Sequence, residues 1–205
     1  MVAITLPVAA MMSACGSGDD GQAPEIPDAP PINEAEPRGE PKVDEPVTTA
    51  PMILSSEAFV NGEAIPVRFT ADGEDISPPL FWDHLPEGTQ EVALICETTD
   101  AAEGEPAVHW LIWGMEPRVK AFTEQVPRIP RFGRENHIRQ GKNDFGIVGW
   151  NGPKPPAGKT YNYEFTVYAL SESPMVKVNS TKDVLEAAMQ GKILGKASLV
   201  GSYSR

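Results

Sequence analysis

The chain has 205 residues, of which 40% are hydrophobic, and its formal net charge is −12 at pH 7. This length suits one domain of about 150 residues together with an additional segment. Nucleic-acid binding depends on phosphate neutralisation by lysine and arginine, so an acidic chain without a basic stripe argues against a nucleic-acid partner.

The N-terminus predicts a secreted, lipid-anchored protein. Residues 1–14 are small and apolar, but this run is shorter than the roughly 20 apolar residues that span a bilayer. It resembles the apolar part of a secretory signal peptide, and Met12-Ser13-Ala14-Cys15 is similar to a bacterial lipobox. We therefore expect a lipoprotein-type signal peptide at 1–14, lipidation of Cys15, and a location in the bacterial cell envelope, facing the periplasm or the exterior.

One feature of this segment departs from the usual pattern. No lysine or arginine precedes the apolar run, so either the true start lies upstream or the signal is weak. The alternative is an apolar N-terminus in which the cysteine is incidental.

Residues 15–50 are predicted to form a disordered linker. The stretch 16–51 carries nine acidic and two basic side chains, a net charge of −7, and seven prolines occur in 16–50. Such a segment cannot bury enough apolar surface to offset chain entropy, and its charge and prolines keep it extended. We expect it to hold a folded domain, residues 51–205, away from a membrane that the protein contacts only through its lipid.

The domain itself is predicted to be mainly β. Asn61-Gly62 is a strong hairpin-turn signal, and residues 67–70 alternate like a strand before a turn at Asp72-Gly73. Longer runs rich in apolar, β-branched and aromatic residues predict three further strands. They are 91–97, 108–113 and 163–170. The first has two apolar faces, so we expect it to be central and to bury Cys96 as a structural thiol.

Residues 116–142, which contain three prolines, predict a long loop with short turns, a type of segment that is often functional. One helix is expected near the C-terminus, with Ser180 as its N-cap, Asp183 completing the capping pattern and Gly191 ending it. Its apolar stripe is Val184, Leu185, Ala188 and Met189. A last short strand is expected at 199–203. This strand-rich pattern predicts a β-sandwich.

The loop 149–158 is the most informative stretch, because it holds three glycines and three prolines in ten residues. Proline stiffens such a loop, and glycine permits close approach of the backbone. The composition suits a preformed pocket wall whose amides face a small ligand. On composition alone, an ordinary structural turn is an equal alternative.

This loop resembles the GY-x-GP-x-PP-x-G signature of the phosphatidylethanolamine-binding protein family, and most of all its bacterial Raf kinase inhibitor-like branch. Other motifs of that family follow the same order along residues 52–205, among them Ile76–Leu80, Val108-His109-Trp110 and Gly201–Arg205. The resemblance implies a Greek-key β-sandwich with a few short peripheral helices. It also implies a small pocket for phosphate-like groups, including phospholipid head groups.

The resemblance assigns eight residues to this pocket. They are Thr98, Asp100, His109, Gly149, Gly152, Pro153, Tyr161 and Tyr163. Histidine and tyrosine side chains can donate to an anion, and backbone amides of a glycine-containing loop add donors without net charge. Two of these eight positions depart from the family, since Thr98 replaces an aspartate and Tyr161 replaces a histidine, so we expect weaker or shifted anion selectivity. Without the resemblance, His109 is better explained as a core histidine.

Two functions remain open. The first is a non-enzymatic binding protein for a phosphate-like or phospholipid-head-group ligand. The second is a protein-interaction regulator, such as a protease or kinase inhibitor-like protein, and bacterial relatives are often homodimers. An enzyme is disfavoured because no G-x-S-x-G elbow, P-loop or dinucleotide fingerprint occurs. The three histidines lack metal-ligand spacing, so we expect no metal and no cofactor.

Overall fold

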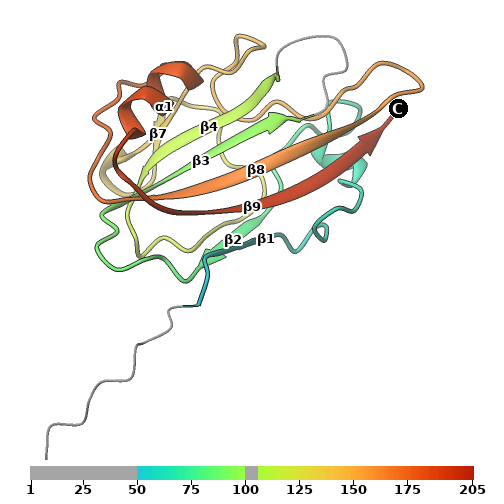
Figure 1. Ribbon diagram of the computed structural model, residues 1–205. Helices are drawn as coiled ribbons and strands as arrows, with labels where there is room; N and C mark the ends of the chain where they lie inside the picture. The colour runs from blue at the N-terminus through green and yellow to red at the C-terminus, as the bar shows by residue number, and fades with distance from the viewer. Residues whose placement is uncertain (1–49, 100–105) are drawn as a thin grey trace, which may run out of the picture. The chain divides into compact units, whose positions relative to one another are not determined.

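The computed structural model describes residues 50–99 and 106–205. The predicted signal peptide, Cys15, the linker up to residue 49 and Asp100 lie outside the described residues. The described part is mainly β, which confirms the predicted fold class. It contains two antiparallel sheets, one α-helix and two short 3-10 helices (Figure 1).

The larger sheet has six strands in the order β6-β7-β4-β3-β8-β9. Its centre is formed by β3 (Glu91–Thr98), β4 (Val108–Met115) and β8 (Thr160–Leu170), which confirms the three strands predicted from apolar runs. The remaining strands are β6 (Arg131–Phe132), β7 (Ile138–Gln140) and β9 (Ile193–Ser204). The last strand is longer than expected, because it pairs with β8 along nearly its whole length.

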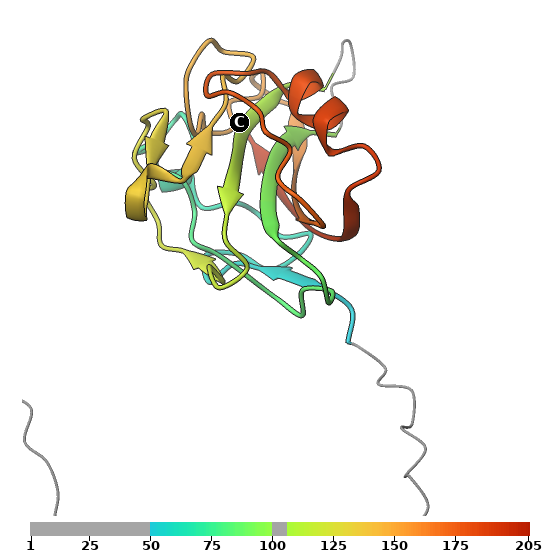
Figure 2. The same cartoon turned by 90° about the vertical axis from the view of Figure 1, so that its left-hand side faces the viewer.

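The smaller sheet has three strands in the order β1-β2-β5. They are β1 (Ile53–Ser55), β2 (Leu80–Asp83) and β5 (Ala121–Phe122). Trp82 from this sheet and Trp110 and Phe165 from the larger sheet are buried in one apolar cluster. The two sheets therefore form a sandwich with its main core between them (Figures 1 and 2).

A second, smaller core covers the opposite face of the larger sheet. Alternate residues of β3 and β4, such as Ile95 and Trp113, pack there against Leu185 and Met189 of α1 (Lys182–Met189). The central strands are thus buried on both faces, as their continuous apolar runs predicted. Cys96 is buried as expected, and burial raises the pKa of its thiol.

The helix differs from its prediction at two places. Thr181, rather than Ser180, is the N-cap, and its side chain makes no capping hydrogen bond. Val184 is 50% exposed, because a helix of eight residues lying on one sheet buries only the narrow stripe that faces the sheet. None of the described helices is long and apolar enough to cross a membrane.

Three predictions for the first and middle segments are wrong. Val67–Phe69 is a 3-10 helix (η1), not a strand, because the Thr70 amide and hydroxyl both donate to the Val67 carbonyl. Asn61-Gly62 forms a turn that is attached to β9 through Val200, rather than the tip of a hairpin. Segment 116–142 is more regular than expected. It contains β5, β6, β7 and the 3-10 helix η2 (Arg134–Asn136).

Candidate functional site

A pocket of about 200 Å³ lies where β3 ends and β4 and β8 begin. Its walls combine residues from these strands with residues of two loops. They are Thr98, Ala107, His109, Phe145, Gly152, Lys154, Tyr161 and Tyr163. Five of the eight residues that the sequence assigned to a ligand site are therefore brought together. Asp100 lies outside the described residues, so its role stays a prediction.

His109 is a buried polar residue of this pocket, with only 3% of its surface exposed. Its Nδ1 lies 2.6 Å from the backbone carbonyl oxygen of Asn151. A carbonyl can only accept, so Nδ1 carries the proton and the Nε2 of the neutral ring presents a lone pair. Within residues 50–99 and 106–205, no group hydrogen bonds to this Nε2.

Burial lowers the pKa of His109, although the hydrogen bond to Asn151 and the charges of Asp144 and Asp75 act in the opposite direction. Burial dominates because removing an imidazolium from water is costly. The ring is therefore neutral at pH 7, and its Nε2 acts as an acceptor rather than as a donor. This differs from the role of anion donor that the family pattern implied for it.

Tyr163 supplies a donor next to this acceptor. Its ring meets the His109 ring edge-on, with 5.0 Å between centroids, and only 1% of the residue is exposed. Burial raises the pKa of Tyr163, while the backbone amide of Lys154 lowers it. The phenol consequently keeps its proton throughout the physiological range.

Tyr161 and Thr98 complete the strand side of the pocket. Tyr161 lies two residues before Tyr163 on β8, so both side chains point to the same face of the sheet. Thr98 is the register partner of Tyr163. Its hydroxyl accepts a hydrogen bond of 2.8 Å from the Ala107 amide. Thr98 therefore also ties together the strands on either side of residues 100–105.

The loop 149–158 closes the pocket from the other side, but its amides are used differently from the prediction. The Gly152 amide donates to Asp75 Oδ1 at 2.6 Å, so it is not available to a ligand. A Cβ on Gly152 would lie 2.7 Å from the Phe69 carbonyl oxygen and from the Ala71 amide nitrogen. Glycine is required there for close packing against the segment that follows η1.

Gly149 and Pro153 lie beside the pocket and not in its wall. The Gly149 carbonyl accepts a hydrogen bond from the Asn143 side chain, and the Pro153 carbonyl accepts one from the Ala71 amide. Gly149 also has φ of +95°, a conformation that favours glycine. Both residues thus fix the loop in position, and the loop is preformed as its composition suggested.

Sequence reasoning missed two pocket residues of clear chemical importance. Phe145 is 49% exposed, and its ring lies 4.9 Å from that of His109 at the pocket mouth. Asn143 holds this turn, because its side-chain oxygen accepts from the amides of Phe145 and Ile147. An asparagine followed by Gly146 is a turn signal that could have located it. The other missed residue is Lys154, an exposed cation in the proline-rich loop.

The assembled site is small and largely aromatic, with few polar groups. It offers the hydroxyl of Tyr163 as a donor and Nε2 of His109 as an acceptor, and Lys154 is the cationic residue of its wall. In the described ranges, no group of three or more histidine, cysteine or acidic side chains is arranged to hold a metal ion. The arrangement suits a small anion that brings a proton of its own.

Comparison with known proteins gives a consistent result. A family model described as "Phosphatidylethanolamine-binding protein" matches residues 55–204. The UPF0098 protein of Aquifex aeolicus is 40% identical over 156 residues, which cover 75% of this chain and 89% of the relative. The UPF0098 protein of Methanothermobacter thermautotrophicus is 39% identical over 154 residues, covering 75% and 99% of the two chains.

Two crystal structures resemble the described domain. A phosphatidylethanolamine-binding protein homologue from Chlamydia trachomatis has a TM-score of 0.67 and 31% identity, covering 76% of this chain and 98% of its own. The E. coli protein YbcL, described as a new member of the mammalian PEBP family, has a TM-score of 0.69 and 27% identity. That match covers 76% of this chain and 99% of the E. coli chain.

Proposed function

The chain belongs to the phosphatidylethanolamine-binding protein family, and from this premise we propose that it is a non-enzymatic protein that binds a small phosphate-like anion or phospholipid head group. The observation that carries the proposal is that one small pocket is lined by the buried residues His109 and Tyr163 and by the cationic residue Lys154. A volume of about 200 Å³ suits a phosphate-sized group rather than a whole lipid.

The protonation states define how the anion would be held. Lys154 provides charge attraction, and the Tyr163 hydroxyl donates a charge-assisted hydrogen bond. Neutral His109 accepts, so it is best satisfied by a protonated oxygen of the ligand. A phosphate monoester loses its second proton near pH 6, and its monoanion has the required P–OH group. Binding is therefore expected to be coupled to proton uptake.

The hydrogen bonds that the hydroxyl and imidazole groups of the pocket already make support a binding role rather than catalysis. The Thr98 hydroxyl accepts from the Ala107 amide, so it is held as a structural group. The partner of His109 Nδ1 is a backbone carbonyl, whereas a general base of a catalytic triad is oriented by a carboxylate. A family of this kind is generally one of binding and regulatory proteins.

The test is thermal unfolding of residues 16–205 with and without millimolar phosphate or phosphoethanolamine. Ligand at about 100 times its Kd stabilises a protein by ~2.7 kcal/mol, which raises the Tm of a domain of this size by roughly 5–10 °C. Lys154→Gln should reduce this rise. Lys159→Gln is the matched control, because Lys159 is an exposed lysine of the same region outside the pocket wall. No rise in the parent protein would contradict the proposal.

We further propose that the domain is attached to the bacterial cell envelope through a lipid on Cys15, with the acidic linker as a spacer. The lipobox-like sequence Met12–Cys15 supports this location. Growth with a radioactive fatty acid tests it, and labelling that persists in Cys15→Ala would exclude lipidation at this residue.

A protein-interaction role is the second candidate, and one observation favours it. Arg131, Arg134 and Arg139 lie together around β6, η2 and β7, at the edge of the larger sheet. None of them forms an ion pair with any of the described residues. In an acidic chain, such a basic edge suits an acidic protein partner. An affinity capture that survives Lys154→Gln but is lost in Arg131→Glu would support this function over the first.

A further inference from the structure

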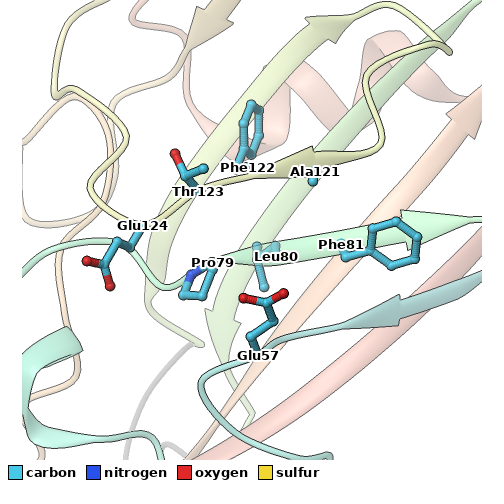
Figure 3. A pocket seen from close by; sticks show the side chains of 8 residues that line it. All are labelled: Glu57, Pro79, Leu80, Phe81, Ala121, Phe122, Thr123 and Glu124. Atoms are coloured by element: carbon cyan, nitrogen blue, oxygen red, sulfur yellow. The ribbon is translucent and has the colours of Figure 1, made fainter.

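A second hollow, of about 400 Å³, lies on the smaller sheet and shares no lining residue with the His109 pocket. Figure 3 shows its eight lining residues, which come from the segment after β1, from β2 and the residue before it, and from β5 with its continuation. They are Glu57, Pro79, Leu80, Phe81, Ala121, Phe122, Thr123 and Glu124. This hollow is about twice as large as the proposed anion pocket.

The hollow lies on the outer face of the sheet. Leu80 and Phe122 are register partners whose side chains are buried in the core, whereas the next pair, Phe81 and Ala121, is exposed. Successive residues of a strand point to opposite faces, so Phe81 and Ala121 must face outwards. An exposed phenylalanine, with 40% of its surface accessible, thus forms part of the wall together with Pro79.

The charges of the hollow have one sign. Glu57 and Glu124 are its only ionisable lining residues, and both are exposed. Glu124 is paired with Arg68, at 3.1 Å between Oε1 and the guanidinium nitrogen. Glu57 forms no ion pair with any residue of the described ranges. The hollow therefore presents one uncompensated carboxylate and a second that is partly neutralised.

A neighbouring hollow of about 320 Å³ extends this site. It shares Glu57, Pro79 and Glu124 with the first and continues towards Arg68. The two glutamates consequently stand in the middle of one groove, which has an apolar end at Phe81 and a polar end at Arg68. A ligand with an apolar body and a single cationic group complements this distribution.

We propose that this groove is a binding site for a small amphiphilic amine, a molecule with a primary ammonium group on a short apolar or aromatic body. The apolar body packs on Pro79 and Phe81, and the ammonium lies near the carboxylate of Glu57. The volume is within the range of about 300–1,000 Å³ that is typical of small-molecule sites. An ammonium group also interacts favourably with an aromatic face. The site is independent of the proposed anion pocket and has the opposite charge preference.

A requirement for a positive charge on the ligand distinguishes this site from a non-specific apolar surface. The probes are 2-phenylethylamine, which is cationic, and 2-phenylethanol, which has the same ring and chain but no charge. In a two-dimensional 15N–1H NMR titration of residues 16–205, the amine should produce saturable shifts of the amides in 80–81 and 121–124. The alcohol should bind at least about twofold more weakly, since an exposed carboxylate contributes a modest attraction.

Two substitutions should act in opposite directions. Glu57→Gln removes the free carboxylate and should weaken amine binding about two- to fivefold. Arg68→Gln releases Glu124 from its ion pair and should tighten amine binding by a similar factor. Glu87→Gln is the control for net charge, because Glu87 is exposed but does not line the groove.

Each outcome of these titrations either supports or overturns the proposed amine site. Weaker binding in Glu57→Gln and tighter binding in Arg68→Gln, with Glu87→Gln unchanged, establish the site. Equal affinity for the amine and the alcohol overturns the proposal, and so does an affinity for the amine that neither Glu57→Gln nor Arg68→Gln alters. Shifts confined to residues outside the groove overturn it as well. Because one variant is expected to gain affinity, a general loss of folding cannot imitate the full pattern.

Discussion

Gly152→Ala tests whether the loop 149–158 is fixed by its packing against residues 69–71, as the contacts of Gly152 indicate. The added methyl group would lie 2.7 Å from backbone atoms of Phe69 and Ala71, whereas ordinary contacts of a Cβ begin near 3.4 Å. The nearest atoms all belong to the backbone of residues 69–71, so no flexible side chain can move away and the loop itself must shift by several tenths of an ångström.

The magnitude follows from two contributions. Overpacking of a well-packed site costs about 1–3 kcal/mol. A shift of the loop also lengthens the 2.6 Å hydrogen bond from the Gly152 amide to Asp75, and a hydrogen bond to a charged group contributes about 1.5–3 kcal/mol. Since the second bond is weakened rather than lost, we expect a decrease of about 2–4 kcal/mol in the free energy of unfolding. The Tm should fall by roughly 5–15 °C.

Urea unfolding of residues 16–205 measures this change, and Gly158→Ala provides the comparison within the same loop. A Cβ on Gly158 meets nothing within 4 Å, but its φ of +76° is unfavourable for alanine. That variant should lose only about 1–2 kcal/mol, the cost of a left-handed conformation. If Gly152→Ala is as stable as the parent, or more stable than Gly158→Ala, the proposed attachment of the loop to the Phe69–Ala71 segment is wrong.

Three further predictions concern the pocket. Tyr163→Phe keeps the buried ring but removes the hydroxyl. Isothermal titration calorimetry should therefore show that the affinity for phosphate is reduced about tenfold or more. An unchanged affinity would mean that the hydroxyl does not touch the ligand. Phosphate affinity in the parent should rise between pH 8 and pH 6, because the monoanion can donate to His109 Nε2, and a flat profile would contradict proton-coupled binding. Burial lowers the pKa of His109 in the folded state below its ordinary 6.5. The unfolded chain then binds more protons between these two values, so stability without ligand should fall as the pH drops below 6.5. Substituting His109→Asn, which keeps a side-chain donor for the Asn151 carbonyl, should flatten that part of the stability profile in urea unfolding at pH 7.5 and 5.5.

The central strands were predictable because their burial on both faces requires a continuous apolar run, which is visible in the local sequence. β3 and β4 are apolar on both faces, and each face has a core of its own, one against the smaller sheet and one against α1. The segment 67–70 shows the limit of the same reasoning. It alternates like a strand, yet its first three residues form η1, because the Thr70 amide and hydroxyl both donate to the Val67 carbonyl.

The pocket was predictable to a similar extent. A family resemblance located five wall residues on separate segments, which local patterns alone would not have joined. Phe145 and Lys154 were missed because each is an exposed residue in a turn or loop, without a periodic signal. The groove at Glu57 was missed for a different reason. Its walls come from segments near residues 57, 80 and 122, which only the packing of the smaller sheet brings together.

The sequence by itself determined the three central strands of the larger sheet, because alternation and apolar runs act between near neighbours in the chain. It also determined the family, through motifs that occur in a fixed order. Only the tertiary structure decided what the polar groups do. The proton of His109 is fixed by a carbonyl 42 residues away, and the amide of Gly152 is occupied by a carboxylate 77 residues away. Hydrogen-bonding roles and pKa shifts depend on such distant partners and on burial, and neither is a property of local sequence.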